Sequence, residues 1–430
     1  MIGIVADDLT GAGDISSMYA RCGLQAFIYP YDRLTREALD DASLRRAAVV
    51  VLDTGSRLDN RDTAYRKTHE ATMRLKKAGA TQYFNKTCSV FRGNVGAAFD
   101  AMLDALGESF AVIVLGFPKN GRTTVDGIHY VRGTKLEDSE FKDDPVHPMR
   151  ESRLAAILGA QTKRKIDSLD YRIVSQGAER LREAIAAKRS SCNYLILDVE
   201  SQQSLGIIAQ AVRDERVLCG SSGLSEELAR LLPPGSPEQG NPLPPLRDDL
   251  GIPVTAGSLM PQTQGQIRYL QANGVTCLEL DSRQWLDESL RQRSVREISE
   301  RVAEELRAGR NMAFHASHAQ SVVEETRSLG IKWGLTRPEV SRIVSSCLAD
   351  ITARVLDLAG QNRFVVAGGE TSAAVCERLG VQGMRVWKEL APGLPSCISL
   401  GASPKFMILK SGSFGRTEFL ADALAHLRSQ

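Results

Sequence analysis

The sequence predicts an α/β protein of two domains, each with a mainly parallel β-sheet covered by helices. Three observations lead to this prediction. Short apolar runs alternate with helical patterns, one stretch dense in proline and glycine divides the chain, and the alternation restarts after it. Strands that alternate with helices favour parallel sheets, because a crossover helix joins consecutive parallel strands. The length of 430 residues also suits two to three average domains.

The first half contains five apolar runs that we expect to form strands. They lie at 2–5, 47–52, 82–85, 111–115 and 194–199. Helical patterns end near residue 21 and recur near 61–78, 94–106, 151–160 and 176–188. Turn or helix signals bound these runs.

Residues 233–253 are expected to form a linker, because they include PPGSPEQGNPLPP. Proline fixes φ and removes a backbone donor, so neither a helix nor a central strand continues through this stretch. The expected domains are therefore residues 1–232 and 254–430. Further strands are expected at 254–256, 275–280, 311–315, 364–367, 384–387 and 406–409, and no internal sequence repeat is found.

Composition excludes several classes of protein. There are 54 Lys and Arg against 52 Asp and Glu, a formal charge of +2, which argues against a nucleic-acid binder. No apolar run is long enough to span a membrane, and the start MIGIVADDLT does not resemble a signal peptide. The eight cysteines form no CxxC pair, which argues against zinc-ligand spacing and a disulfide framework. We expect a cytoplasmic protein.

Three polar loops follow predicted strands of the first domain. Asp7 and Asp8 precede a glycine-containing turn, ADDLTGAGD, and such an acid pair can orient a hydroxyl, take its proton or hold a metal. Residues 53–57, DTGSR, end in an arginine suited to binding a carboxylate. Residues 85–94 combine two cations with hydroxyl and amide groups. Because parallel strands end at one edge of a sheet, these loops are expected to converge.

Each of these loops also has a structural alternative. Asp8 or Thr10 could simply cap the helix that follows, and Arg57 could be a surface arginine near a helix N-terminus. The loop at 85–94 could be an ordinary connection with a capping residue. Two further polar segments, residues 116–123 and 143–149, are expected near the same edge of the sheet.

The second domain contains three glycine-rich turns after predicted strands. They are residues 254–258, 368–372 and 410–415. Glycines let the backbone approach a phosphate, and a helix N-terminus supplies free N–H groups. Neither GxxxxGK[ST] nor a GxGxxG after a strand is present, so this is not a Walker A or Rossmann fingerprint. The residues alone therefore predict an ATP- or phosphate-using α/β enzyme, with structural glycine turns as the alternative.

A specific resemblance rests on the order of several motifs along nearly the whole chain. These motifs are ADDLTGAGD, KTCSVFRGN, DPVHPM, VTAGSLMPQTQGQ, VAGGETS and LKSGSFG. In this ordered set the chain resembles the four-carbon acid sugar kinase family. The resemblance implies ATP-dependent phosphorylation of a four-carbon sugar acid, with the sugar acid on the N-terminal domain, the nucleotide on the C-terminal domain and the active site in the cleft between them.

Carried over residue by residue, the resemblance assigns two sets of residues. The substrate set is Asp8, Arg57, Lys86, Thr87, Cys88 and Ser89, to which Arg92 is added from the same loop. The ATP set is Ser258, Gly368, Gly369, Glu370, Thr371 and Gly412. Many members have K-x-D-S-T-x-R-G-N where this chain has Cys88 and Val90 at the Asp and Thr positions.

The expected mechanism uses these two sets. Asp7 or Asp8 orients or deprotonates the attacking hydroxyl, expected to be the terminal 4-OH, while Arg57 and the loop of residues 86–92 hold the carboxylate. Mg²⁺ is expected to bind through ATP and water, with Glu370 as an indirect ligand and no residue assigned as a direct one.

D-threonate is the first substrate considered. The alternatives are 3-oxo-tetronate or erythronate phosphorylation, a dehydrogenase or aldolase acting on a sugar acid, and a non-catalytic sugar-acid-binding protein. The expected partners are the sugar acid and ATP, without nucleic acid or membrane, and a homodimer is also considered.

Overall fold

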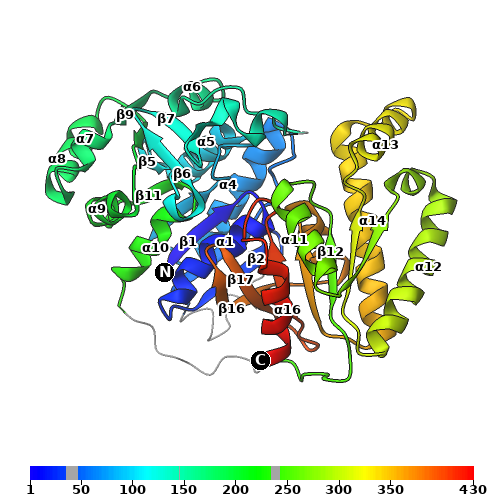
Figure 1. Cartoon of the computed structure of the whole chain (residues 1–430). Coiled ribbons are helices and arrows are strands. Elements are labelled where there is room, and N and C mark those ends of the chain that lie inside the picture. Colours follow the sequence, from blue (N-terminus) through cyan, green and yellow to red (C-terminus); the bar gives the residue numbers. More distant parts are fainter. Residues whose placement is uncertain (35–46, 145, 234–242) are drawn as a thin grey trace. The chain divides into compact units, whose positions relative to one another are not determined.

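Apolar segments of four to eight residues form most strands of this chain, among them IGIVA, VVVLD and RFVVA, whose side chains are all or nearly all buried. The computed structural model describes residues 1–34, 47–144, 146–233 and 243–430. It divides the chain into two units, Met1–Pro237 and Glu238–Gln430 (Figure 1). Residues 234–242 of the predicted linker lie outside the described residues. The prediction of an α/β protein with large, mostly parallel sheets is confirmed.

The sheet of unit 1 is entirely parallel. Its strand order is β2-β3-β1-β4-β11-β5-β10-β9. The strands are β1 (Ile2–Ala6), β2 (Ala26–Pro30), β3 (Val49–Asp53), β4 (Gln82–Lys86), β5 (Ala111–Val114), β9 (Ile166–Leu169), β10 (Tyr194–Leu197) and β11 (Val217–Gly220). The chain leaves the central β1 in one direction, to β2, and later crosses β1 in the other direction, from β3 to β4.

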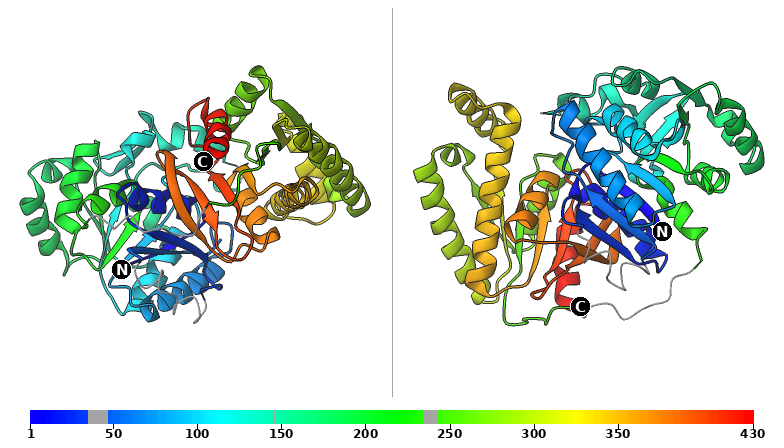
Figure 2. Two further views of the ribbon diagram at one scale, coloured as in Figure 1. Left: turned by 90° about the horizontal axis from the view of Figure 1, so that it is seen from below. Right: turned by 180° about the vertical axis from the view of Figure 1, so that it is seen from behind.

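Helices cover both faces of this sheet. They are α1 (Leu9–Arg21), α4 (Arg61–Lys77), α5 (Val95–Leu106), α6 (Leu154–Gly159), α7 (Tyr171–Val174), α8 (Ala178–Lys188), α9 (Gln202–Val212) and α10 (Gly223–Arg230). Helix α1 packs with α10, and α4 packs with α5. The chain passes from β1 to β2 in one direction along the sheet and from β3 to β4 in the other. Because such crossovers are right-handed, the pair α1 and α10 and the pair α4 and α5 lie on opposite faces of the sheet (Figures 1 and 2).

A small antiparallel sheet follows β5, and the sequence analysis did not predict it. It consists of β6 (Arg122–Val125), β7 (Ile128–Val131) and β8 (Thr134–Lys135). Short 3₁₀ turns flank it at Pro118–Asn120, Leu136–Asp138 and Glu140–Asp143.

The sheet of unit 2 is parallel except for one strand, β17, near one end. Its order is β13-β14-β12-β15-β18-β17-β16, and β17 runs antiparallel to both β16 and β18. The strands are β12 (Pro253–Ala256), β13 (Thr276–Leu280), β14 (Met312–Ala316), β15 (Arg363–Ala367), β16 (Met384–Ala391), β17 (Leu394–Ser399) and β18 (Phe406–Lys410). The central β12 is again crossed by the chain, here from β14 to β15.

Helices also cover the unit 2 sheet, and their apolar faces form its core. They are α11 (Pro261–Ala272), α12 (Glu288–Arg307), α13 (Gln320–Lys332), α14 (Arg337–Ala359), α15 (Gly369–Arg378) and α16 (Phe419–Ser429), with a 3₁₀ turn at Ser282–Leu286. Helices α12 and α14 pack side by side against β14 around the buried Trp285 (Figure 2).

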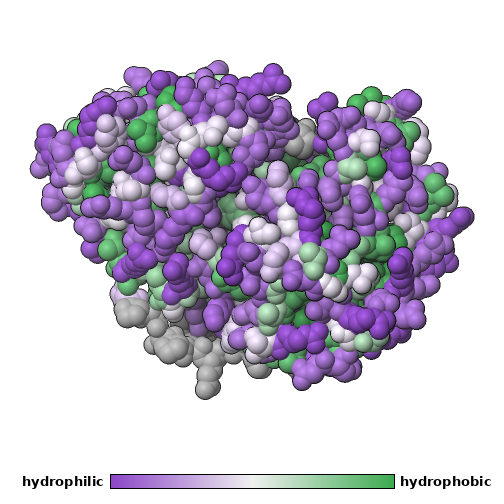
Figure 3. Space-filling model, viewed as in Figure 1, coloured by the Kyte–Doolittle hydropathy of each residue, from purple (hydrophilic) through white to green (hydrophobic). Residues whose placement is uncertain are grey.

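The surface is dominated by hydrophilic residues on the face that Figure 3 shows, with hydrophobic residues scattered among them. None of the helices within the described ranges combines the length and the apolar character that crossing a membrane requires.

Candidate functional site

The ends of three neighbouring strands bring the predicted substrate loops together in unit 1. Strand β1 lies between β3 and β4, and Ala6 is in register with both Asp53 and Lys86. The loops that follow these strands therefore start side by side, at the carboxyl edge and at the point where the chain reverses direction across the sheet. Open α/β sheets bind ligands at such a point.

Arg57 bridges the two adjacent aspartates of the first loop. Its Nε and one terminal nitrogen donate to the two oxygens of Asp7, at 3.0 and 2.6 Å. Its other terminal nitrogen donates to Asp8 Oδ2 at 2.5 Å. The guanidinium offsets the repulsion between the two carboxylates, which lie side by side.

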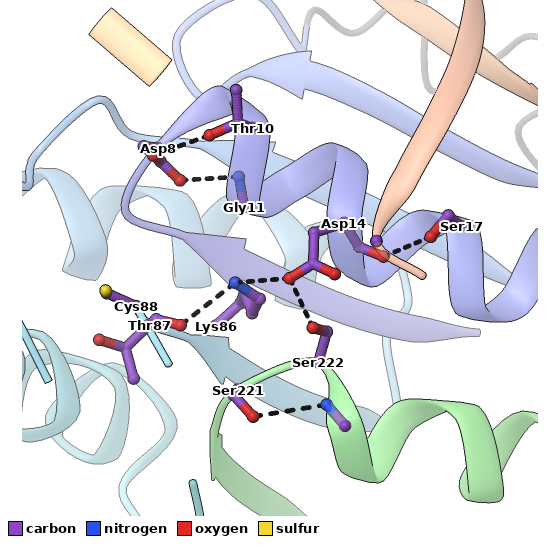
Figure 4. Close-up of polar contacts among 12 residues, drawn as sticks. Asp8, Thr10, Gly11, Asp14, Ser17, Lys86, Thr87, Cys88, Ser221 and Ser222 are labelled. Carbon is purple, nitrogen blue, oxygen red and sulfur yellow. Dashed lines mark hydrogen bonds and ion pairs between the residues drawn. The ribbon is translucent and has the colours of Figure 1, made fainter. Parts of the chain in front are cut away.

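Asp8 also caps helix α1. Its Oδ1 accepts the backbone N–H of Gly11 at 2.7 Å, and its Oδ2 accepts the Thr10 hydroxyl at 3.0 Å (Figure 4). Burial alone would raise the pKa of Asp8, but the positive charges of Arg57 and Lys86 outweigh it and hold the pKa below its usual value. Glycine is required at position 11, because a Cβ there would lie 2.5 Å from Asp8 Oδ1. Asp8 thus caps the helix and pairs with Arg57 at the same time.

Lys86 carries a buried positive charge beneath this loop. Its Nζ lies 3.3 Å from Asp14 Oδ2 and donates to the Thr87 carbonyl at 3.1 Å (Figure 4). Asp14 in turn accepts the Ser222 hydroxyl at 2.5 Å. Burial raises the pKa of Asp14, although Lys86 and Ser222 act against it. This network ties α1, β4 and the start of α10 together.

The loop after β4 places a thiol beside two cations. Arg92 Nε lies 3.3 Å from Cys88 Sγ, one Arg92 terminal nitrogen donates to Asp144 at 2.7 Å, and the guanidinium lies over the Phe141 ring. Burial acts to raise the pKa of Cys88, but the positive charges of Arg92 and Arg57 lower it by more, so the net shift of the pKa is downward. Arg92 thus anchors the loop to the segment at 143–149, where Asp144 Oδ1 accepts the backbone N–H of His147 at 2.8 Å.

Thr87 and Ser89 are fixed through their backbones. Thr87 N–H donates to the Gly220 carbonyl at 2.9 Å, and the Ser89 carbonyl lies 2.9 Å from Nε2 of the fully buried His129. The Thr87 hydroxyl is buried and has no hydrogen-bond partner among the described residues. All seven residues of the predicted substrate set, together with Asp7, therefore lie on the loops at this edge.

The sequence analysis did not assign three residues that the structure brings to this edge. Asp14 and Ser222 support Lys86, and Asp53 ends β3 beside Ala6. Burial, with smaller contributions from Asp8 and Asp7, raises the pKa of Asp53 to about 7. Asp14 belongs to the quoted ADDLTGAGD motif, which was its one visible signal. In the polar segment 116–123, which was also expected near this edge, Lys119 is paired with the buried Glu226 at 2.5 Å.

Three strand ends also meet in unit 2. Ala256, Ala367 and Lys410 are in register across β12, β15 and β18. Gly257 N–H donates to the Ala367 carbonyl at 3.0 Å, and Gly368 N–H donates to the Lys410 carbonyl at 2.8 Å. The three glycine-rich turns consequently lie next to one another.

Close approach explains the glycines of these turns. A Cβ on Gly412 would lie 2.1 Å from Ser258 Oγ, and one on Gly257 would lie 2.1 Å from Thr371 Oγ1. Gly368 has φ of +132°, which side chains rarely allow, and Gly369 is the first residue of α15. Ser258, Gly368, Gly369, Thr371 and Gly412 thus surround the N-terminus of a ten-residue helix, a setting that favours phosphate.

Glu370 differs from its neighbours because its side chain is bonded to α14. Its Oε2 accepts the Ser341 hydroxyl at 2.6 Å, whereas its Oε1 is buried without a hydrogen-bond partner in the part of the chain that the structure describes. Burial raises the pKa of Glu370. A free, buried carboxylate oxygen beside a phosphate-type turn fits a water-mediated contact to Mg²⁺.

Two family models match separate parts of this chain. A family model described as a sugar-binding N-terminal domain matches residues 2–228, and one described as a nucleotide-binding C-terminal domain matches residues 254–420. Two 3-oxo-tetronate kinases, from Cupriavidus necator and Pseudomonas savastanoi, are each 31% identical over 99% of this chain and 97% of their own length.

A solved structure of a Salmonella typhimurium protein, provisionally described as a tRNA synthase, has a TM-score of 0.80 and 28% identity over 98% of both chains. The match to the sugar-binding model spans more than half of this chain, and the matches to the kinases span nearly all of it. This chain belongs to the four-carbon acid sugar kinase family and is a sugar-acid kinase.

Proposed function

We propose that this kinase transfers the γ-phosphate of ATP to the terminal 4-hydroxyl of a four-carbon sugar acid, with 3-oxo-tetronate as the first candidate. The observation that carries the proposal is the acid pair bridged by Arg57, which lies on the same sheet edge as the Cys88–Arg92 loop. The names of the relatives favour 3-oxo-tetronate over D-threonate, and erythronate is the further alternative.

We assign the substrate carboxylate to the cations of this edge. Arg57 has five N–H donors and uses three on Asp7 and Asp8, so two are left to bind a substrate. Arg92 likewise has donors beyond those bonded to Cys88 and Asp144. The polar groups of Thr87 and Ser89 would then bind hydroxyl or oxo groups along the short chain of the substrate.

Asp8 is better suited to orienting the attacking hydroxyl than to acting as the base that keeps the proton of that hydroxyl. Both its oxygens already accept hydrogen bonds, and its pKa is held below the usual value by Arg57 and Lys86 against the effect of burial. Phosphoryl transfer passes through a loose transition state, so positioning and charge neutralisation contribute most of the rate. Asp7, held by two bonds from Arg57, would keep the pair in place.

In unit 2, we assign the nucleotide phosphates to Ser258, Gly368, Gly369, Thr371 and Gly412. Mg²⁺ bound to ATP would neutralise charge on the transferring phosphoryl group. Glu370, through its free buried oxygen, would hold a water molecule of that ion. A homodimer and a cytoplasmic location remain predictions, and sedimentation analysis and cell fractionation would test them.

A coupled ADP-release assay with Mg-ATP tests the proposal. The acceptors are 3-oxo-tetronate and the D and L forms of threonate and erythronate. We expect kcat/KM for 3-oxo-tetronate to exceed the others by about tenfold or more, because a site built for an oxo group pairs differently with a hydroxyl. Faster turnover of a threonate or erythronate would reassign the substrate. No ADP release with any of these acceptors would contradict the four-carbon acceptor, and absence of ATP binding would contradict the kinase assignment.

A further inference from the structure

Lys410 is a fully buried lysine at the end of β18, two residues before Gly412. Its Nζ donates to Thr263 Oγ1 at 3.0 Å, to the Ser411 carbonyl at 2.7 Å and to the Gly412 carbonyl at 3.2 Å. Thr263, on α11, also donates to the Gly412 carbonyl, at 2.8 Å. One ammonium group thus binds two carbonyls of the Ser411–Gly412 turn and the Thr263 hydroxyl. This turn lies so close to Ser258 that position 412 has no room for a side chain.

A comparison with Lys86 shows what this lysine lacks. Both lysines are buried and end a parallel strand at the carboxyl edge of their sheets. Lys86 has the carboxylate of Asp14 at 3.3 Å (Figure 4). Lys410 is bonded to neutral oxygens, and among the described residues no charged side chain on any element packed against it contributes to the shift of its pKa. Burial alone lowers that pKa to about 7.

We propose that Lys410 is a positioning residue of the nucleotide site, which holds the Ser411–Gly412 turn against Ser258 and supplies a buried positive charge whose counter-charge is the nucleotide's phosphates. The inference rests on the assignment of the nucleotide to the glycine-rich turns of unit 2. A buried ammonium without a carboxylate is costly, and an anion on the adjacent turn offsets that cost. Lys410 therefore favours the occupied site over the empty one.

Nucleotide binding should consequently take up a proton. At pH 8 most of the buried amine is neutral in the free protein, because its pKa is about 7, and the phosphates raise that pKa. Calorimetry with a non-hydrolysable ATP analogue and Mg²⁺, in two buffers of different ionisation enthalpy, measures this uptake. We expect the wild type to take up nearly one proton more than Lys410→Met at pH 8, and this difference to be smaller at pH 6.

The same variant separates a nucleotide role from a purely structural one. Below pH 7 the wild type must bury a charged lysine, so ligand-free Lys410→Met should melt at the same or a higher temperature at pH 6.5. Its affinity for the analogue should nevertheless fall by about tenfold or more. Lys86→Met is the matched control, because removal of that lysine leaves Asp14 buried without its cation and should lower the melting temperature.

A second pair of variants keeps the test decisive if Lys410→Met does not fold. Thr263→Val removes the hydroxyl that binds both Lys410 and Gly412, and Thr263→Ser keeps it. We expect the valine variant to lose affinity for the analogue and the serine variant to recover most of it. Equal affinity in wild type, Lys410→Met and Thr263→Val would overturn the inference alone. A wild type that binds no nucleotide would overturn the proposed function as well.

Discussion

Adjacent carboxylates repel each other, and Arg57 lies between the two aspartates that follow β1. Its planar group makes two bonds to Asp7 and one to Asp8, a geometry that a lysine cannot reproduce. Arg57 was predicted as a ligand of the substrate carboxylate. Its bonds in the structure indicate a second role, the alignment of the acid pair, and the two roles are compatible because two of its donors are left over.

Asp53 is the residue of this edge whose protonation changes near neutral pH. Its pKa is raised to about 7, first by burial and then by the charges of Asp8 and Asp7. The folded state therefore binds a proton that the unfolded state has already lost above pH 4, so the stability of the protein falls as pH rises toward 7. We expect Asp53→Asn to raise the free energy of unfolding at pH 8 by about 1–3 kcal/mol, and by less at pH 5.

Urea denaturation at both pH values measures this difference. Asp214→Asn is the matched control, because the Asp214 side chain is 86% exposed and its removal should change stability little at either pH. A stability gain from Asp53→Asn that is equal at pH 5 and pH 8 would show that Asp53 does not titrate between them.

At the scale of elements, the small sheet β6-β7-β8 holds the loop after β4, which carries Cys88 and Ser89, through a hydrogen bond from His129. His129 on β7 lies between the Ser89 carbonyl, 2.9 Å from Nε2, and Thr124 Oγ1, 3.0 Å from Nδ1. Burial lowers the pKa of His129 to about 3, so the ring is neutral at pH 7. Nε2 then donates to Ser89, and Nδ1 accepts from Thr124.

We expect His129→Leu to loosen the loop that carries Cys88 and Ser89. The change leaves the Ser89 carbonyl and the Thr124 hydroxyl without their partner and should cost about 2–3 kcal/mol of stability. KM for the sugar acid should rise more than KM for ATP, which initial-rate kinetics measures. The wild type should also lose stability as pH falls from 6.5 toward 3, because the unfolded chain binds a proton that folded His129 excludes, and the variant should lose less. Equal increases in both KM values would contradict a local role.

The sequence predicted several elements whose signals are local. Strands β1 and β3 are apolar runs and β4 (QYFNK) is a mixed one, each with a polar loop directly after it that carries predicted substrate residues. The apolar β2 (AFIYP) was nevertheless not predicted. The antiparallel β17 was missed because its sequence, LPSCIS, contains a proline and polar residues, and its pairing with β16 and β18 stabilises it. The Pro392-Gly393 dipeptide between β16 and β17 is a turn signal that could have indicated the hairpin.

The parts of the site that the sequence could not reveal depend on contacts between distant segments. Ser222 and Asp14 are 208 residues apart and share one hydrogen bond. Lys410 ends an ordinary apolar strand, and only its burial between α11 and the Gly412 turn distinguishes it from other lysines. Asp53 was included in a predicted loop, but its raised pKa follows from packing that no local pattern encodes.

At the scale of the whole molecule, the two units share the same connectivity of their first four strands, although no internal sequence repeat is found. In unit 1 the four strands β2-β3-β1-β4 are adjacent, and in unit 2 the strands β13-β14-β12-β15 follow the same order of first, second, third and fourth strand. In each unit the chain crosses its own first strand, and the candidate ligand loops follow that strand and the strand reached by the crossing. The rule for open α/β sheets thus predicts the position of both candidate sites from topology alone.

This division predicts that each ligand stabilises the protein through its own unit. A ligand at 100 times its Kd adds about 2.7 kcal/mol to the stability of a site that it occupies. Asp8→Asn removes the charge that we propose orients the substrate hydroxyl, so it should abolish turnover and sugar-acid-dependent stabilisation while ATP-dependent stabilisation persists. Gly412→Ala should have the reverse effect on the two ligands, because the added Cβ would lie 2.1 Å from Ser258 Oγ. Thermal melts with each ligand alone measure both effects.

Gly265→Ala supplies the matched control for the glycine variant. Gly265 lies within α11 of the same unit, and a Cβ there meets no atom within 4 Å, so this change should leave both ligand effects intact. Alanine also has the higher helix propensity, which should stabilise the ligand-free protein slightly. If Asp8→Asn and Gly412→Ala each removed stabilisation by both ligands, the sites would not be separable. The sugar acid and the nucleotide would then have to be assigned to shared residues, because two independent sites cannot lose both ligands through one local change.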